Sequence, residues 1–456
     1  MFSHKYLNII MGNILKSLAE QIISPQWIIP ITEKGKKVDK VLTDHSLVIN
    51  EHKISKILPT AEALAHYQTE QHFNLPGQAL IPGLINIHTH AAMSLFKGLA
   101  DDLPLMLWLQ NHIWPAEKKW VDDAFCYDGL QLAIAEMLKS GTTCFNDMYF
   151  QPHITAKAAK EFGIRASVGM LMFDFPSVWG TGPDEYLHKG LQLRDDYKHS
   201  ELISFAFAPH APYTVSDEPL KKIATISNEL SIPIHMHVHE TAQEVKDAYN
   251  ATGKRPLQRL ADLGLVTPNL IAVHMTQLQR SEIELLAKNG VSIAHCPESN
   301  MKLASGICPV QDLITAGINV AIGTDGNASN NDLDMLGEIK SAALLGKVFS
   351  GSAQACSAFE MLYAATMGGA KALAQDEIIG SLEEGKAADL TAINLNTLES
   401  QPTYDPISQI VYTAGREQVS HVWVNGHLKV KQHQLVNINQ QQLLDMAKHW
   451  SKKIQS

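Results

Sequence analysis

The sequence has few cysteines, no long apolar run and no basic stripe, and each absence argues against a class of protein. The five cysteines are odd in number, widely separated and without C-x-x-C spacing, which argues against a disulfide framework and against a thiolate zinc site. No apolar run reaches the length of about 18 residues that a membrane-spanning helix needs. The N-terminal segment has no sustained apolar core and no small-residue cleavage site, so we expect no export signal. These absences predict a protein of the reducing cytoplasm with no membrane partner.

Positive charge is also scarce. The chain carries 37 lysines and arginines against 47 aspartates and glutamates, which gives a formal net charge of −10. Nucleic-acid-binding proteins usually carry a basic patch, so we expect no nucleic-acid partner. The overall composition is typical of a globular protein. The 456 residues, 45% apolar and 18% charged, are enough for one large domain and a smaller one.

The middle of the chain alternates between short, apolar, β-rich runs and segments with helical spacing. The helical segments often end in Gly or Asn, as helices do at their C-termini. Eight such units in series favour a closed (β/α)₈ barrel of the TIM type, with an open doubly wound sheet as the alternative. The eight runs are 84–90, 142–148, 165–172, 203–210, 233–240, 270–275, 291–297 and 319–325.

Short alternating strands, separated by turn residues, flank the barrel on both sides. We interpret them as two halves of one small β-sandwich domain, because the two ends of a domain often lie close together. The predicted divisions are an N-terminal extension at 1–21, β-sandwich segments at 22–80 and 381–436, the barrel at 81–380 and an amphipathic C-terminal helix at 437–456.

Nearly every predicted barrel strand ends in a side chain that can do chemistry. In a (β/α)₈ barrel the active site is built at the C-terminal ends of the strands. This placement therefore predicts an enzyme with a polar site at one end of the barrel. The strand ends hold His88 and His90, Asn146 and Asp147, His210, residues 237–240, His274, His295 and Asp325.

Three histidines and one carboxylate of this set could bind a single metal ion. His88 and His90 lie on one face of a strand, about 7 Å apart along the backbone. With Asp325 and one histidine of the fifth strand they form a set suited to Zn²⁺, with Fe²⁺ as a competitor. No lysine or glutamate ends the fourth strand, where a ligand that bridges two metals could sit. We therefore predict one ion per chain.

The fifth strand leaves a choice open. His235, His237 and His239 alternate onto the same face. We expect His235 to lie one layer deeper, and the spacing alone favours neither His237 nor His239 as the ligand.

The chain resembles the amidohydrolase superfamily, and within it the methylthioadenosine/S-adenosylhomocysteine deaminases and their chlorohydrolase relatives. The resemblance covers nearly the whole chain and rests on "LIPGLINIHTHAAMSLFKGL", "PIHMHVHET", "HCPESNMKLASG", "GTDGNASNNDLDM" and "GSLEEGKAADL". It implies a homo-oligomer, either a dimer or a tetramer. It also favours His237, because the glutamate of the family stands three residues beyond its ligand, at Glu240. The implied metal ligands are His88, His90, His237 and Asp325.

The resemblance also implies how the site works. The ion activates a water molecule that attacks the amine-bearing carbon of a purine. Glu240 resembles the group that moves a proton to the adjacent ring nitrogen, His274 resembles the group that orients the water, and Asp325 is both ligand and base. The residues that match the substrate contacts of the family are Trp108, Glu117, His210 and Glu240.

A departure from the family suggests the preferred substrate. Relatives that act well on S-adenosylhomocysteine carry arginines after the third strand, whereas no arginine lies between Arg165 and Arg194 here. Apolar residues stand there instead, and Lys189 is the cation that could replace the arginines. We therefore expect hydrolytic deamination of 5′-methylthioadenosine to 5′-methylthioinosine and ammonia, ahead of adenosine and S-adenosylhomocysteine. The apolar residues are Met170, Met172, Phe173, Phe175 and Trp179.

Two alternatives remain open at this point, because a fold does not determine a function. One is a related aminohydrolase or chlorohydrolase that acts on a triazine, guanine or cytosine. The other is a non-catalytic scaffold, although such homologues typically lose metal ligands and this chain has all four.

Overall fold

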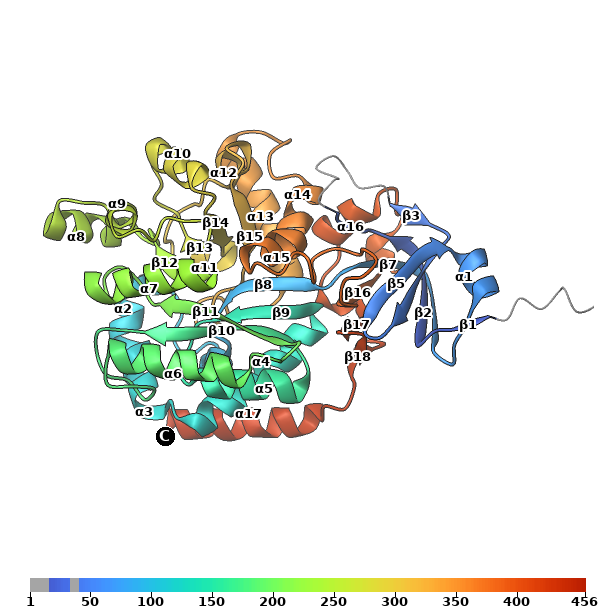
Figure 1. Ribbon diagram of the computed structural model, residues 1–456, viewed down its shortest axis with the longest axis horizontal. Helices are drawn as coiled ribbons and strands as arrows, with labels where there is room; N and C mark the ends of the chain where they lie inside the picture. Colours follow the sequence, from blue (N-terminus) through green and yellow to red (C-terminus); the bar gives the residue numbers. More distant parts are fainter. Residues whose placement is uncertain (1–15, 33–40) are drawn as a thin grey trace, which may run out of the picture.

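The computed structural model describes residues 16–32 and 41–456. Eight parallel strands form one sheet that follows the order of the chain (Figure 1). Its two edges meet, because the backbone N–H of Asp325 donates to the carbonyl of His88 at 3.0 Å. The predicted (β/α)₈ barrel is confirmed. Its strands are β8 (Leu84–Thr89), β9 (Thr142–Asp147), β10 (Arg165–Met172), β11 (Ile203–Pro209), β12 (Ile234–Val238), β13 (Leu270–His274), β14 (Ser292–His295) and β15 (Asn319–Ile322).

Helices cover the outside of the barrel (Figure 1). Their ends follow local sequence signals. In α4, for example, the side chain of Asp122 caps the first turn by accepting from the backbone N–H of Phe125, and α5 ends at Gly163, whose φ of 67° suits glycine. The helices between the strands are α2 (Leu105–Trp108), α3 (Trp114–Trp120), α4 (Asp123–Lys139), α5 (Pro152–Phe162), α6 (Pro183–Asp196), α7 (Asp217–Leu230), α8 (Ala242–Thr252), α9 (Pro256–Asp262), α10 (Arg280–Lys288), α11 (Pro297–Lys302) and α12 (Val310–Thr315); those after β15 are α13 (Met335–Ser350), α14 (Ala358–Tyr363), α15 (Gly369–Ala372), α16 (Pro406–Tyr412) and α17 (Gln440–Gln455).

A second sheet combines strands from both ends of the chain. Strand β7 joins the two halves, since it pairs in parallel with β2 and antiparallel with β16. Alternate residues of these strands bury apolar side chains around Trp423. The predicted β domain, composed of both chain ends, is therefore confirmed. The sheet contains β2 (Gln21–Ile28), β3 (Leu42–Thr43), β4 (His45–Asn50), β5 (Lys53–Pro59), β7 (His72–Pro82), β16 (Leu390–Asn394), β17 (Val419–Val424), β18 (His427–Lys431) and β19 (Gln434–Leu435), and beside it lie β1 (Ser17–Leu18), α1 (Thr60–His66) and β6 (Tyr67–Gln68).

The β domain contacts the N-terminal end of the barrel strands. Arg165, the first residue of β10, binds Asp389 through two hydrogen bonds of 3.0 and 3.2 Å, and both side chains are buried. Asp389 directly precedes β16 and also accepts the backbone N–H of Asn425 at 2.7 Å. This end of the barrel is thus attached to the second sheet, and the C-terminal strand ends lie at the opposite end.

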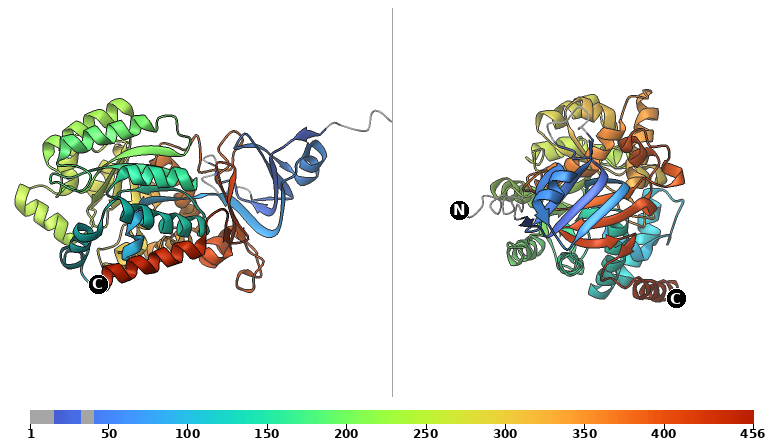
Figure 2. Two further views of the ribbon diagram at one scale, coloured as in Figure 1. Left: turned by 90° about the horizontal axis from the view of Figure 1, so that it is seen from below. Right: turned by 90° about the vertical axis from the view of Figure 1, so that its right-hand side faces the viewer.

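The C-terminal helix α17 lies along the barrel against α4 (Figure 2). The indole of Trp450 packs edge-on against Phe125 with ring centroids 5.3 Å apart, and its Nε1 donates to Asp128 at 2.8 Å. The last turns of the chain therefore cover an outer face of the barrel, on the side away from α8 and α9.

The predicted domain boundaries remain a proposal. Residues 1–15 of the predicted extension lie outside the described residues, whereas β1 and the start of β2 lie within 16–21. The boundary at residue 80 falls inside β7. No helix in the described part of the chain is long and apolar enough to cross a membrane.

Candidate active site

A cavity of about 700 Å³ opens at the C-terminal ends of the barrel strands. All nine predicted site residues except His88 line it, and His88 lies directly beneath. A cavity of about 730 Å³ in the β domain contains none of them, so size alone does not identify the active site. The eight that line the first cavity are His90, Trp108, Glu117, His210, His237, Glu240, His274 and Asp325.

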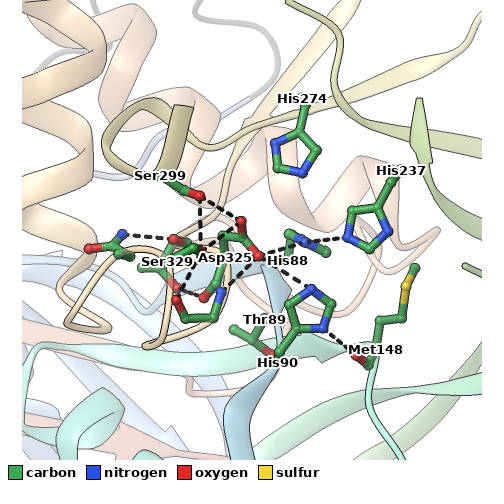
Figure 3. Close-up of polar contacts among 12 residues, drawn as sticks. His88, Thr89, His90, Met148, His237, His274, Ser299, Asp325 and Ser329 are labelled. Carbon is green, nitrogen blue, oxygen red and sulfur yellow. Dashed lines mark hydrogen bonds and ion pairs between the residues drawn. The ribbon is translucent and has the colours of Figure 1, made fainter. Parts of the chain in front are cut away.

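The four predicted metal ligands converge (Figure 3). One donor atom from each of His88, His90, His237 and Asp325 lies within 4.8 Å of every other. Nε2 of His88 and Nε2 of His90 lie 3.2 and 3.3 Å from Oδ1 of Asp325. Nε2 of His237 lies 3.2 Å from Nε2 of His88.

The hydrogen bonds of two of the three imidazoles fit a cation at the centre of the cluster. Nδ1 of His237 donates to the carbonyl of His210 at 2.8 Å, and Nδ1 of His90 donates to the carbonyl of Met148. A carbonyl only accepts, so both rings carry their proton on Nδ1 and present a lone pair at Nε2. Lone pairs and a carboxylate that face one another repel unless a cation lies between them. The described residues therefore fit a single divalent ion.

Asp325 is held in place from several sides. Its Oδ2 accepts from Ser299 at 2.7 Å and from Ser329 at 3.1 Å, and its Oδ1 accepts the backbone N–H of Gly326 at 2.8 Å. Burial opposes its ionisation, but the neighbouring imidazoles of His88, His90 and His274 hold the pKa of Asp325 well below its usual range. The carboxyl group is therefore available as an anionic ligand.

Glu240 differs from Asp325 in its protonation. It follows β12, and its side chain lines the cavity. Burial, together with the nearby charge of Asp325, raises the pKa of Glu240 to about 8. A carboxyl group that keeps its proton at neutral pH can donate it, so the two carboxyls suit opposite roles in proton transfer.

His274 ends β13 and stands between Glu240 and the metal ligands. Its Nδ1 donates to Oδ1 of Asn300 at 2.9 Å, which leaves Nε2 directed toward Glu240 at 3.8 Å from Oε2. Its ring stacks on that of His237 with centroids 5.4 Å apart. His274 is therefore positioned to contact a molecule beside the metal site without belonging to the four-ligand cluster.

The predicted substrate contacts line the outer part of the same cavity. Trp108 is buried, and its Nε1 donates to the carbonyl of Ala100 at 3.1 Å. Burial raises the pKa of Glu117 to about 7 and lowers the pKa of His210 to about 3. A neutral His210, bonded through Nδ1 to Thr214 at 3.1 Å, can offer one ring nitrogen to a ligand.

Apolar side chains also line this cavity, but the sequence predicted only some of them. Phe173 and Phe175 line the cavity and stack on each other at 4.7 Å. Met170, Met172 and Trp179 are not part of its lining. Further apolar lining residues that sequence reasoning missed come from α2, the π-helical turn after it, α3 and the loop after β10; they are Leu105, Met106, Leu109, Trp114 and Val178.

Lys189 does not reach this cavity. It is paired with Glu185 at 2.6 Å, and its Nζ also donates to the carbonyl of Trp179 at 2.8 Å. Among the described residues that line the cavity, Lys118 is the single lysine or arginine, and its side chain is exposed. The cation that could meet a negatively charged ligand thus lies on α3 and not after the third strand.

Further groups hold the site residues in place. Ser299, Asn300 and Ser329 follow the seventh and eighth strands, and each bonds to Asp325 or His274. The carbonyls of Met148 and His210 leave no sequence signal, because every residue carries one.

Comparison with known proteins is consistent with this geometry. The chain is 50% identical over 442 residues to a 5-methylthioadenosine/S-adenosylhomocysteine deaminase of Saccharophagus degradans, which covers 97% of this chain and 98% of the relative. It is 42% identical over 421 residues to a 5′-deoxyadenosine deaminase of Methanopyrus kandleri, covering 92% and 97%. The crystal structure of an adenosine deaminase from Xanthomonas campestris with bound zinc superimposes with a TM-score of 0.94 at 47% identity, covering 96% of this chain and 99% of that one.

A model of the amidohydrolase family matches residues 79–429. This range extends from β7 to β18 and so includes every barrel strand and every residue of the site. Both the sequence match and the close relatives thus support the resemblance on which the site was predicted, and the chain belongs to the amidohydrolase family.

Proposed function

We propose that this protein is a zinc-dependent deaminase of adenine nucleosides that converts 5′-methylthioadenosine to 5′-methylthioinosine and ammonia. The observation that carries the proposal is the convergence of four ligand atoms beside Glu240, a carboxyl group whose raised pKa lets it keep its proton. The names of the relatives support the substrate class, and the zinc in the Xanthomonas structure supports zinc over iron. A homo-oligomer and a cytoplasmic location remain predictions.

In this mechanism the bound ion supplies a Lewis acid that activates water. His274 accepts a hydrogen bond from that water and directs its oxygen to the amine-bearing ring carbon. Asp325 takes the proton that the water loses, and Glu240 donates its own proton to the adjacent ring nitrogen. The proton on Asp325 passes to the amine, the carbon–nitrogen bond breaks, and ammonia leaves. The hydroxyl group on the ring carbon returns its proton to Glu240 and becomes the carbonyl of the product, so both carboxyl groups regain their starting states.

The outer cavity accounts for the rest of the substrate. Glu117 accepts from the ribose hydroxyls, while Trp108 and His210 contact the nucleoside. A methylthio group gains from burial against Phe173 and Phe175, whereas a carboxylate loses hydration there unless a cation pairs with it. We therefore expect 5′-methylthioadenosine first, adenosine next and S-adenosylhomocysteine last.

A parallel assay of several substrates on one zinc-loaded preparation tests this proposal. Ammonia release is measured with 5′-methylthioadenosine, adenosine, S-adenosylhomocysteine, guanine, cytosine and a chlorotriazine, with Glu240→Gln as the control for contaminating deaminases. The expected result is the stated order of kcat/KM. Turnover of the chlorotriazine alone, or of no nucleoside, would contradict the proposed function, and equal efficiency with S-adenosylhomocysteine would contradict the proposed preference.

A further inference from the structure

His235 lies directly beneath the metal site and has no role in the mechanism above. It is fully buried in β12, two residues before His237, and it does not line the cavity. Its Nε2 lies 2.7 Å from Nδ1 of His88, and the two rings are nearly perpendicular, with an interplanar angle of 79°. The two histidines therefore share one proton in a short hydrogen bond.

The partner of Nδ1 differs among the three ligand histidines. His90 and His237 donate Nδ1–H to backbone carbonyls, which can only accept, so their tautomers are set by the main chain. His88 faces an imidazole instead, and an imidazole can either accept or donate. The tautomer of His88 thus depends on which way this one hydrogen bond runs.

The two directions have opposite consequences for metal binding. If His88 donates, its Nε2 keeps a lone pair toward the other ligand atoms, and the proton of His235 must then lie on Nδ1. If His235 donates, the proton of neutral His88 lies on Nε2, where it blocks the ion. In the first case Nδ1–H of His235 is a buried donor, and Nδ1 of His235 has no partner among residues 16–32 and 41–456.

We propose that His235 is a positioning residue that accepts the Nδ1 proton of His88 and thereby keeps His88 in the tautomer that binds the metal. The inference rests on the proposed metal site. Groups that bond to the far side of a ligand histidine fix its tautomer and orientation, and their loss typically weakens metal binding by about 10- to 100-fold. Buried polar groups are nearly always hydrogen-bonded, so the unpaired donor on His235 calls for a functional explanation.

His295 provides a matched control. It is buried to the same degree and ends the neighbouring β14, and its Nδ1 also lacks a partner in the described part of the chain. It makes no hydrogen bond to any of the four ligands. Substitution of His295 therefore reproduces the loss of a buried imidazole without the loss of a bond to His88.

The test is the affinity of the full-length protein for Zn²⁺, measured by competition with a chelator, together with the visible spectrum of the Co²⁺-substituted protein. We expect His235→Phe to weaken zinc binding about 10- to 100-fold and to alter the cobalt spectrum. His235→Gln, whose amide oxygen can still accept, should stay within a few-fold of the wild type, and His295→Phe should match the wild type. At saturating zinc, His235→Phe should recover most of kcat, because His235 acts through His88.

The outcomes separate this inference from the proposed function. If the wild type binds no zinc, the proposed function fails. If the wild type binds zinc and His235→Phe binds it equally well, or if His295→Phe is weakened as much, only the role of His235 is overturned. Should His235→Phe fail to fold, His235→Met takes its place, since a thioether is only a weak acceptor and a flexible apolar side chain fills the site. Zinc binding by His235→Met as tight as by His235→Gln would then contradict the inference.

Discussion

The two ends of the barrel differ in how their buried ionisable groups are balanced. At the N-terminal end, Arg165 and Asp389 neutralise each other through two hydrogen bonds, and both groups are buried between the barrel and the β domain. At the C-terminal end, three imidazoles and a carboxylate converge, with one ligand atom of each within 4.8 Å of every other. There His239, His274 and Asp325 also adopt positive φ values of 55°, 73° and 64°.

This difference indicates that one end serves stability and the other serves chemistry. Positive φ is unfavourable for residues other than glycine, so three residues at the C-terminal end hold strained backbone conformations. The buried cluster of three imidazoles and one carboxylate is stable once a cation binds at its centre. We therefore expect substitutions at the C-terminal end to reduce activity more than folding, and substitutions at the N-terminal end to do the reverse.

The largest effect is expected from removal of a metal ligand. His237→Ala should lose both zinc and measurable activity, because it removes one of the four ligand atoms that converge on the site and leaves a gap in its place. Elemental analysis and ammonia release on the same sample measure both. A protein chelated and then reloaded with Zn²⁺ serves as the positive control, and two tightly held ions per chain would contradict the single-metal site.

Glu240→Gln should separate chemistry from metal binding. The amide keeps the size of the side chain but cannot donate the proton, so kcat should fall about 10²- to 10⁴-fold while the zinc content stays at one per chain. A near-normal kcat would show that another group transfers this proton.

At the opposite end, Arg165→Met should reduce stability and spare catalysis. Removal of one partner from a buried ion pair costs about 3–5 kcal/mol, because the carboxylate of Asp389 is left buried and unpaired. Unfolding in urea measures the loss, and kcat is measured on the folded, zinc-loaded protein. The double variant Arg165→Met/Asp389→Asn keeps an acceptor for the N–H of Asn425 and should regain part of the lost stability. A large drop in kcat for Arg165→Met would contradict the assignment of stability to one end and chemistry to the other.

The smallest effect is expected at the rim of the cavity. Lys118→Met should lower kcat/KM for S-adenosylhomocysteine by up to about fivefold, since an exposed ion pair contributes at most about 1 kcal/mol. The value for 5′-methylthioadenosine should not change. Lys119→Met is the matched control, because Lys119 lies over the ring of Trp120 and does not line the cavity. Equal losses for both nucleosides would assign Lys118 a role unrelated to the carboxylate.

Part of the candidate site could be predicted from the sequence, because these residues lie at the ends of strands that the local pattern reveals. Strand ends carry His88, His90 and Asp325, and the barrel rule places such ends together. Lys189 shows the limit of this reasoning. It was considered as a cation for the substrate, but Glu185, one helical turn away, and the carbonyl of Trp179 hold it elsewhere. A long flexible side chain has many partners within reach, and the sequence does not rank them.

The sequence by itself determined the barrel, the composite β domain and the end of the barrel that holds the polar residues, because hydrophobic periodicity and turn signals are local properties of the chain. Only the tertiary structure decided what the histidines in and directly after β12 contact. The alternation of side chains along a strand predicts that all three point to the same face. The neighbouring strands and helices determine what each of them contacts. His235 meets His88 from below, His237 reaches the ligand cluster, and His239 instead accepts the backbone N–H of Leu257 at 3.2 Å. Such contacts join residues far apart in the chain, so no pattern within one strand encodes them.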